Sequence, residues 1–273
     1  MEGLAQIVSE GDERFAYDIG AGDDATAAEH ERLSLLSAVY DKGSIRLIES
    51  LGIAPGWHCL EVGAGHGGLA RWLAEAVGDD GRVMATDTDT RFLTDMPANV
   101  IVREHDIASG RLPAAHFDLA HARAVLQHVP ERERALDNMI DATKPGRWVV
   151  IEDVDWLVFD NQELPEPFAT LHRTVREAYT ANAGYDGEWG RRMLPAMRAA
   201  GLVDVESRGT VTTMHGGAAS AEWYVMALAR AGPALVDAGL LDQPTVDDAI
   251  AQAREPSFVV LSPLSISAWG RKP

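Results

Sequence analysis

Short apolar runs and longer amphipathic stretches alternate along residues 58–153. Each run suits one buried strand, and each stretch carries apolar residues at the spacing of a helix face. The predicted strands are 58–62, 82–86, 100–104, 117–121 and 147–153. The predicted helices between them are 67–77, 90–96 and 131–143. This alternation predicts an α/β fold, a Rossmann-like doubly wound sheet with parallel strands.

The segments around this core follow other patterns. Residues 27–51 have helical apolar spacing and should form one helix, or two helices joined near Gly43. Further helices are expected at 166–182, 189–200 and 219–254. The last of these should break at Gly232-Pro233 and at Gly239, because glycine and proline are the strongest breakers of a helical pattern.

Two long strand candidates, 202–213 and 257–269, follow the alternating units. Pro263 interrupts the second one and argues for a bulge or an edge position, since proline cannot donate to a strand ladder. We expect the two to pair antiparallel and to complete a seven-stranded mixed sheet with helical cap insertions. The expected segments are an arm or lid at 1–26, cofactor-binding core at 27–153, a cap insertion at 154–188, core at 189–213, a helical insertion at 214–256 and a terminal core strand at 257–273.

A glycine-rich turn joins the first predicted strand to the first predicted helix. Its glycines are Gly63, Gly65, Gly67 and Gly68. This spacing satisfies the G-x-G-x-x-G pattern of dinucleotide-binding folds, and Asp87 follows about 20 residues later, where such folds place their ribose-binding acid. A nicotinamide or flavin oxidoreductase is therefore one interpretation of the turn.

Other features favour a different nucleotide-like ligand. Glu61 lies two residues before the turn, where a carboxylate would repel a pyrophosphate but suits a ligand with an ammonium and a sulfonium. Asp106 follows the third predicted strand and could accept from an adenine amino group. A helical region also precedes the first strand, whereas nicotinamide domains often begin with that strand.

These stretches match the motifs of one family. The matching stretches are 60–67, 83–89, 104–107, 117–128 and 136–153. Through them the chain resembles class I S-adenosylmethionine-dependent methyltransferases, most fully over roughly residues 30–155. Two positions depart from the family pattern, because His66 stands where a small or hydroxylic residue is more usual and Arg147 replaces a glycine.

The resemblance implies S-adenosylmethionine as cofactor and assigns roles around the glycine turn. The backbone at Gly63 and Gly65 would face the methionine portion, and Glu61 would hold its ammonium. His66 would contact the methionine portion or face solvent. Asp87 would accept from both ribose hydroxyls, or instead cap the helix expected at 90–96.

The resemblance also implies roles for residues after the second strand. Thr88 would lie beside the ribose or adenine, Asp106 would take the adenine amino group or act as a turn residue, and Ile107 would give backbone contact and apolar cover. Arg123 would pair with the cofactor carboxylate or form a surface salt bridge. His128 is a candidate general base for methylation of oxygen or nitrogen, or else a packed structural histidine.

The acceptor site should come from the segments that decorate the core. They supply aromatic and imidazole side chains suited to a flat apolar molecule, and the alternative interpretation is a second small core under a cap. The candidate substrate-binding residues are Tyr17, Trp156, His172, Tyr179, Tyr185 and Trp189.

The composition limits the kinds of molecule that the protein is expected to bind. The formal charge of −18 argues against nucleic-acid binding. No apolar run is long enough to span a membrane, and the N-terminus does not look like a signal peptide, so a cytoplasmic protein is expected. Cys59 is expected to be a small core residue. The histidines lack tight ligand spacing, so no metal site is predicted.

Together these observations predict an enzyme that methylates a small apolar or aromatic metabolite, with secondary metabolism as its setting. Methyl transfer is an in-line displacement assisted mainly by proximity. The alternatives are an S-adenosylmethionine-binding enzyme that catalyses a rearrangement or cyclisation, an NAD(P)-dependent oxidoreductase and a silent binding module. The sequence leaves open the methylated atom and the choice between a monomer and a homodimer.

Overall fold

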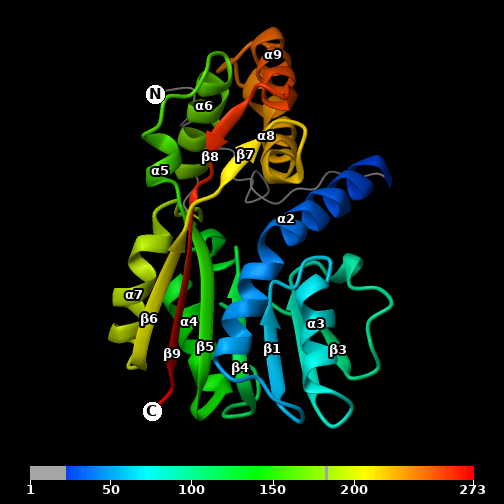
Figure 1. The fold of residues 1–273 in the computed structure, drawn as a ribbon, viewed down its shortest axis with the longest axis vertical. Helices are drawn as coiled ribbons and strands as arrows, with labels where there is room; N and C mark the ends of the chain where they lie inside the picture. The colour runs from blue at the N-terminus through cyan, green and yellow to red at the C-terminus, as the bar shows by residue number, and fades with distance from the viewer. Residues whose placement is uncertain (1–22, 182–183) are drawn as a thin grey trace. The chain divides into compact units, whose positions relative to one another are not determined.

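The computed structural model describes residues 23–181 and 184–273 (Figure 1). Tyr17 and most of the arm expected at 1–26 lie outside this range. The chain divides into two compact units. The first, called the sheet unit here, comprises 40–156, 186–210 and 264–273. The second, called the helical unit, comprises 1–39, 157–185 and 211–263.

A seven-stranded sheet forms the centre of the sheet unit, in the order β3-β2-β1-β4-β5-β9-β6. The first five strands run parallel, and β9 runs antiparallel to both β5 and β6. The expected α/β class and the antiparallel closing pair are confirmed. The strands are β1 His58–Val62, β2 Arg82–Asp87, β3 Val100–Glu104, β4 Phe117–Arg123, β5 Thr143–Asp155, β6 Val203–Thr210 and β9 Leu264–Arg271.

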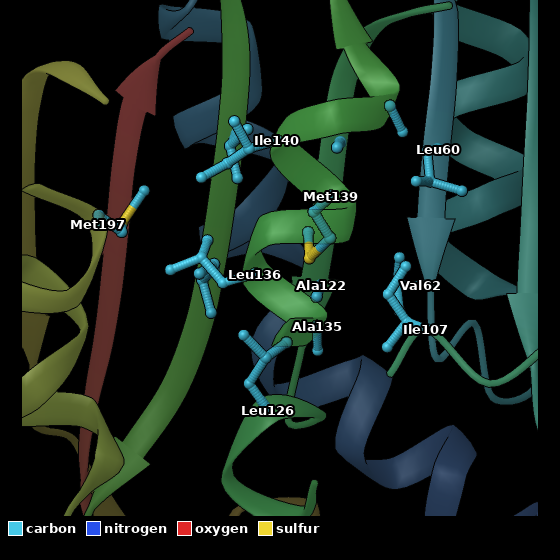
Figure 2. Packing of buried hydrophobic residues seen from close by; sticks show 14 of the residues in the cluster. Leu60, Val62, Ile107, Ala122, Leu126, Ala135, Leu136, Met139, Ile140 and Met197 are labelled. Carbon is cyan, nitrogen blue, oxygen red and sulfur yellow. The ribbon is translucent and has the colours of Figure 1, made fainter. Parts of the chain in front are cut away.

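Helices cover both faces of this sheet. On one face, Leu47 and Ile48 of α2 and Leu69 and Leu73 of α3 pack against the alternate residues of the central strands. On the other face lie α4 and α7, and Figure 2 shows the cluster that they form with β1 and β4. The helices are α2 Asp23–Ser50, α3 Gly68–Val77, α4 Arg132–Ala142 and α7 Trp189–Ala199. Each fully buried leucine in these clusters contributes roughly 1.5–3 kcal/mol.

The structure corrects one helix prediction near the core and decides between the two alternatives of another. The helix expected at 90–96 is a single 3-10 turn, η1 Thr90–Phe92, because Asp95 has a φ of 51° and a residue before a proline, here Met96, disfavours helical geometry. By contrast, α2 continues through Gly43 without a joint. An exposed glycine costs a helix only about 1 kcal/mol relative to alanine, so the helix tolerates it.

Within its described residues, the helical unit contains the first part of α2, four complete helices and a two-stranded antiparallel sheet. Its elements are α5 Leu157–Asp160, α6 Phe168–Ala181, β7 Thr213–His215, α8 Ala219–Asp237, α9 Gln243–Arg254 and β8 Val259–Leu261. The break expected at Gly232-Pro233 is wrong, because α8 runs through it and ends just before Gly239, whose φ is 68°. A Cβ at Gly232 would lie 2.7 Å from a methyl group of Val246 on α9, so the glycine allows the two helices to pack closely.

The two long strands expected at 202–213 and 257–269 each divide between the two sheets. Their inner parts pair as β6 and β9 in the seven-stranded sheet, and their outer parts pair as β7 and β8. Pro263 stands between β8 and β9, so it marks a change of sheet. It does not mark a bulge within one strand.

Candidate functional site

The glycine turn after β1 has a backbone that only glycine adopts readily. Gly63, Gly65 and Gly67 have φ values of 65°, 57° and 84°, all in the left-handed region. A Cβ at Gly63 would collide with the side chain of Val125, which follows β4. The sequence therefore folds here into a compact turn that holds the end of β1 close to the end of β4.

Asp87 at the end of β2 is tied to this turn. One carboxylate oxygen accepts from the Gly65 N–H at 2.8 Å, and the other accepts from the Asp89 N–H at 3.1 Å. Burial raises the pKa of this half-buried carboxyl. Asp89 caps η1 by accepting from the Arg91 N–H, so Asp87 does not serve as the cap. Each Asp87 oxygen keeps a further lone pair for a ligand hydroxyl, and Thr88 beside it is exposed.

Asp106 and Ile107, the candidates expected beside the adenine ring, differ in their exposure. Asp106 is exposed, and one of its carboxylate oxygens accepts from the Ala108 N–H at 2.8 Å, as in an Asx turn. Ile107 is buried in the cluster beside α4, and its carbonyl accepts from the Asn138 side chain at 2.7 Å. The Asp106 side chain thus stabilises the turn and keeps a second carboxylate oxygen, whereas the Ile107 side chain is a core group.

Glu61 lies in a buried row of ionisable side chains on the face of the sheet covered by α2. Its carboxylate is 2.7 Å from Nδ1 of His121, and Nε2 of His121 is 3.0 Å from Glu152. Glu61 and Glu152 are each 4% exposed, and His121 is fully buried. One imidazole therefore joins two carboxylates from strands on either side of it.

Burial and charge act in opposite directions on these groups. Burial disfavours the His121 cation, but the two carboxylates outweigh it and raise the pKa of His121 to about 9. Burial likewise opposes ionisation of Glu152, yet His121 and the hydroxyls of Ser267 and Ser44 lower its pKa to about 2. Burial raises the pKa of Glu61, and His121 only partly offsets this.

Arg123 belongs to the same row. Its guanidinium donates to the Ser44 hydroxyl at 2.9 Å and to the Asp41 carboxylate at 2.5 Å, both on α2. Ser44 in turn donates to Glu152. The pairing expected for Arg123 with a cofactor carboxylate thus competes with a salt bridge that is partly buried.

His66 and His128 occupy turns at the carboxyl ends of β1 and β4. Nδ1 of His66 accepts from the Gly68 N–H at 3.3 Å, and the ring is half-buried. His128 ends the 3-10 turn η2 Leu126–His128, and its Nε2 lies 3.1 Å from the Gln127 amide nitrogen. His128 is half-buried, and its packing against Gln127 fits the structural interpretation as well as the catalytic one.

The structure divides the acceptor candidates between the two units. Trp156 and Trp189 are buried in the sheet unit, and Trp189 packs into the core with α4 and α7. Because Trp189 is only 2% exposed, the structure places it as a core residue and not on a ligand-accessible surface. Its place in the apolar cluster, with the Arg132 guanidinium 5.7 Å from the ring centroid, could not be read from local sequence spacing.

His172, Tyr179 and Tyr185 belong to the helical unit. His172 is buried and lies 2.7 Å from the Tyr224 hydroxyl and 2.9 Å from Asp160. Burial lowers the pKa of His172 despite Asp160. Tyr179 and Tyr185 meet edge to face at 5.5 Å. A hollow of about 620 Å³ lies along α6, and among the described acceptor candidates only His172 contributes to its lining.

Several buried ionisable residues were absent from the sequence-based set of candidates. Among them are His121, Glu152 and Asp153, which lie on the neighbouring strands β4 and β5. Burial raises the pKa of Asp153 well above its usual range, although backbone N–H groups of η2 oppose this. The available signal was an ionisable residue within an otherwise apolar strand, which is unusual unless it is paired.

Other expectations concern single groups. Cys59 is buried in the cluster beside α3, and burial raises the pKa of its thiol, so it is a core residue as expected. Within residues 23–181 and 184–273, no cluster of three or more histidine, cysteine or acidic side chains is arranged to hold a metal ion. Over the same part of the chain, no helix has the length and apolar character needed to cross a membrane.

Comparison with known proteins gives a consistent family. A family model described as a methyltransferase domain matches residues 29–206. The methyltransferase str2 of Strobilurus tenacellus is 30% identical over 142 residues, which are 51% of this chain and 51% of that protein. The chain thus spans about half of the length of that relative.

Two solved structures share the fold. Phosphoethanolamine N-methyltransferase 2 of Haemonchus contortus, in complex with phosphomonomethylethanolamine and S-adenosylhomocysteine, aligns with a TM-score of 0.54 and 16% identity over 85% of this chain and 52% of that one. The cyclase SpnF aligns with a TM-score of 0.54 and 19% identity over 85% of this chain and 80% of that one. At these identities the likeness is one of fold.

Proposed function

The chain belongs to the methyltransferase-domain family, and on that premise we propose that it transfers a methyl group from S-adenosylmethionine to a small apolar or aromatic metabolite. The observation that carries the proposal is the contact between Asp87 and the glycine turn. This contact places a carboxylate, which would accept from the ribose hydroxyls, beside the backbone of Gly65. The contact lies at the adjacent carboxyl ends of β1 and β2. Ligands of open α/β sheets bind at these strand ends.

The residues present fit this cofactor. The glycines supply the left-handed backbone of the turn without side chains of their own, and Val125 fills the space that a Cβ at Gly63 would need. Asp87 would accept from the ribose hydroxyls, with Thr88 alongside. The backbone of Gly63 and Gly65 would face the methionine portion, and Glu61 would receive its ammonium.

The remaining cofactor roles rest on the motif resemblance. Asp106 would accept from the adenine amino group through the oxygen that the turn does not use, and the backbone of Ile107 would lie beside the ring. His66 would reach the methionine portion from the turn. Arg123 would contact the cofactor carboxylate only if its salt bridge to Asp41 rearranged.

When bound, S-adenosylmethionine supplies a methyl group activated by a sulfonium. The chain contributes proximity and alignment of an acceptor with that methyl group, which is the main assistance an in-line displacement needs. His128 is the candidate for removing a proton from an oxygen or nitrogen acceptor. Carbon, nitrogen and oxygen acceptors all remain within the proposal.

The acceptor would be a small molecule. The protein would act in the cytoplasm as a monomer or homodimer and would bind neither nucleic acid nor a membrane. A net charge of −18 supports the absence of nucleic-acid binding, because the phosphate backbone of a nucleic acid would be repelled. In the helical unit, His172, Tyr179 and Tyr185 are the candidates for apolar contact with the acceptor. In the sheet unit, the candidate is Trp156.

The two alternative chemistries differ in their support. A non-methylating enzyme would use the same cofactor residues, and the cyclase SpnF shares the fold at 19% identity, which does not favour that chemistry for this chain. An oxidoreductase would bring a pyrophosphate next to Glu61, which is buried and acidic. Family membership and Glu61 both support methyl transfer over hydride transfer.

Calorimetric titration of the protein with S-adenosylmethionine and, separately, with NADH tests the proposal. We expect binding of S-adenosylmethionine, weakened about 10- to 150-fold in Asp87→Ala, since hydrogen bonds to a charged group contribute about 1.5–3 kcal/mol. Asp80→Ala is the matched control, because Asp80 is exposed and should leave affinity unchanged.

Turnover is measured in the same series by release of S-adenosylhomocysteine during an acceptor screen. Binding of NADH alone would overturn the proposal and convert the glycine turn into a pyrophosphate site. Cofactor binding and acceptor conversion without release of S-adenosylhomocysteine would favour the non-methylating alternative.

A further inference from the structure

The buried row on the α2 face of the sheet contains more ionisable groups than the proposed roles use. Glu61 and His121 stand opposite each other in the pairing of β1 with β4. Arg123 and Glu152 stand opposite each other in the pairing of β4 with β5. Asp41 on α2 completes the set. These five side chains are called the charge row below.

His121 is the centre of the charge row. It is fully buried, with Glu61 at 2.7 Å on one ring nitrogen and Glu152 at 3.0 Å on the other. Glu152 is held in turn by the hydroxyls of Ser44 on α2 and Ser267 on β9. The imidazole ring cannot rotate without breaking one of the two contacts, so His121 holds the Glu61 carboxylate in one position.

The charges around His121 do not balance among the described side chains. Two carboxylates, Glu61 and Glu152, share the imidazolium of His121, while Arg123 is paired with Asp41, so the ionised group of three carries one net negative charge. An uncompensated charge is costly in a buried setting. In the chain by itself a proton on Glu61 can compensate, in keeping with the raised pKa of Glu61.

We propose that His121 is a positioning residue for the ammonium group of the cofactor's amino-acid tail. His121 holds Glu61 in place for that ammonium, and the two carboxylates that contact His121 remain one cation short. This inference rests on the proposed function. The ammonium of the tail takes the place of the proton on Glu61 and balances the row. A histidine in this position serves better than a neutral residue, because the imidazolium favours the ionised form of Glu61.

Calorimetry with three adenosine ligands tests this role. S-adenosylmethionine and S-adenosylhomocysteine both carry the amino-acid tail, whereas 5′-methylthioadenosine keeps the adenosine and sulfur and lacks the tail. We expect His121→Gln to weaken the two tail-bearing ligands by about 10- to 100-fold and to leave 5′-methylthioadenosine unchanged. His116→Gln makes the same chemical change at an exposed histidine and should alter none of the three.

The pH profile supplies a readout that a merely structural role would not move. Affinity of the native protein for S-adenosylhomocysteine should rise with pH as Glu61 ionises. Since His121 lowers the pKa of Glu61 against the effect of burial, the midpoint of that rise should move to higher pH in His121→Gln. Arg123, Asp41 and Glu152 also face this group and are unchanged in the variant.

Glu152→Gln provides a second variant if His121→Gln fails to fold. It keeps a hydrogen-bond acceptor for His121 but removes the surplus negative charge, so tail-bearing ligands should again weaken selectively. Equal weakening of all three ligands, or of none, in the folded variants would overturn the inference and leave the proposed function intact. If the native protein bound none of the three, the proposed function itself would fail and the inference with it.

Discussion

The charge row makes the stability of the sheet unit depend on pH in a defined direction. The two carboxylates raise the pKa of His121 from 6.5 to about 9 against the effect of burial. A group with a raised pKa in the folded state binds its proton more tightly there than in the unfolded chain. The stabilisation is therefore complete below pH 6.5 and is lost as pH rises toward 9.

The size of this effect follows from the shift. One pKa unit corresponds to about 1.4 kcal/mol, so the rise in the pKa of His121 amounts to about 3 kcal/mol of unfolding free energy. This energy needs no reduction for screening by solvent, because the His121 side chain is 0% exposed. That amount is a large fraction of the stability of an ordinary domain.

Urea denaturation at pH 6.5 and at pH 9, followed by circular dichroism and tryptophan fluorescence, measures the loss. His121→Gln removes the titrating group, so the advantage of the native protein over this variant should shrink by about 3 kcal/mol across the interval. His116→Gln should keep the native pH slope. Identical slopes for the native protein and His121→Gln would refute the assignment of a protonated, paired His121.

Two further variants test the core and the glycine turn. Leu136→Ala removes a side chain on α4 that is 1% exposed. Urea denaturation should show that the free energy of unfolding falls by about 2–5 kcal/mol. A fall well below that range would mean that the cluster in Figure 2 is loosely packed. Gly63→Ala must adopt a φ of 65° and meet Val125, so calorimetry and thermal melting should show reduced cofactor affinity and stability. The double variant Gly63→Ala with Val125→Ala should recover the stability lost through the steric clash, but not the backbone cost of about 1–2 kcal/mol. Native behaviour of Gly63→Ala alone would show that the turn accepts a side chain.

Most of the core was predictable because its signals are local. The strand, turn and helix over 58–77 depend on neighbouring residues: an apolar run, glycines with positive φ and apolar positions at helical spacing. The predicted strand at 100–104 matches β3 residue for residue. Asp87 was identified from its position at a strand end, and the structure places it in contact with the turn.

Predictions failed where a local signal was overlooked and where contacts between distant elements override local preference. The pattern at 90–96 favours a helix, but Asp95 and the proline that follows limit it to one turn. At Gly232-Pro233 the local signal for a break is strong, yet packing of α8 on α9 needs a residue without a side chain and keeps the helix continuous. Trp189 looked like an acceptor contact and is a core residue.

The α/β class, the family motifs and the glycine turn follow from the sequence alone, because each of these is encoded within a short stretch of chain. The buried row of Glu61, His121 and Glu152, joined to Ser44 and Ser267, arises only when the chain is folded. These residues come from α2 and from four neighbouring strands, β1, β4, β5 and β9, which are not consecutive in the chain. Their contacts depend on strand order and register, which long-range packing sets and local periodicity does not specify.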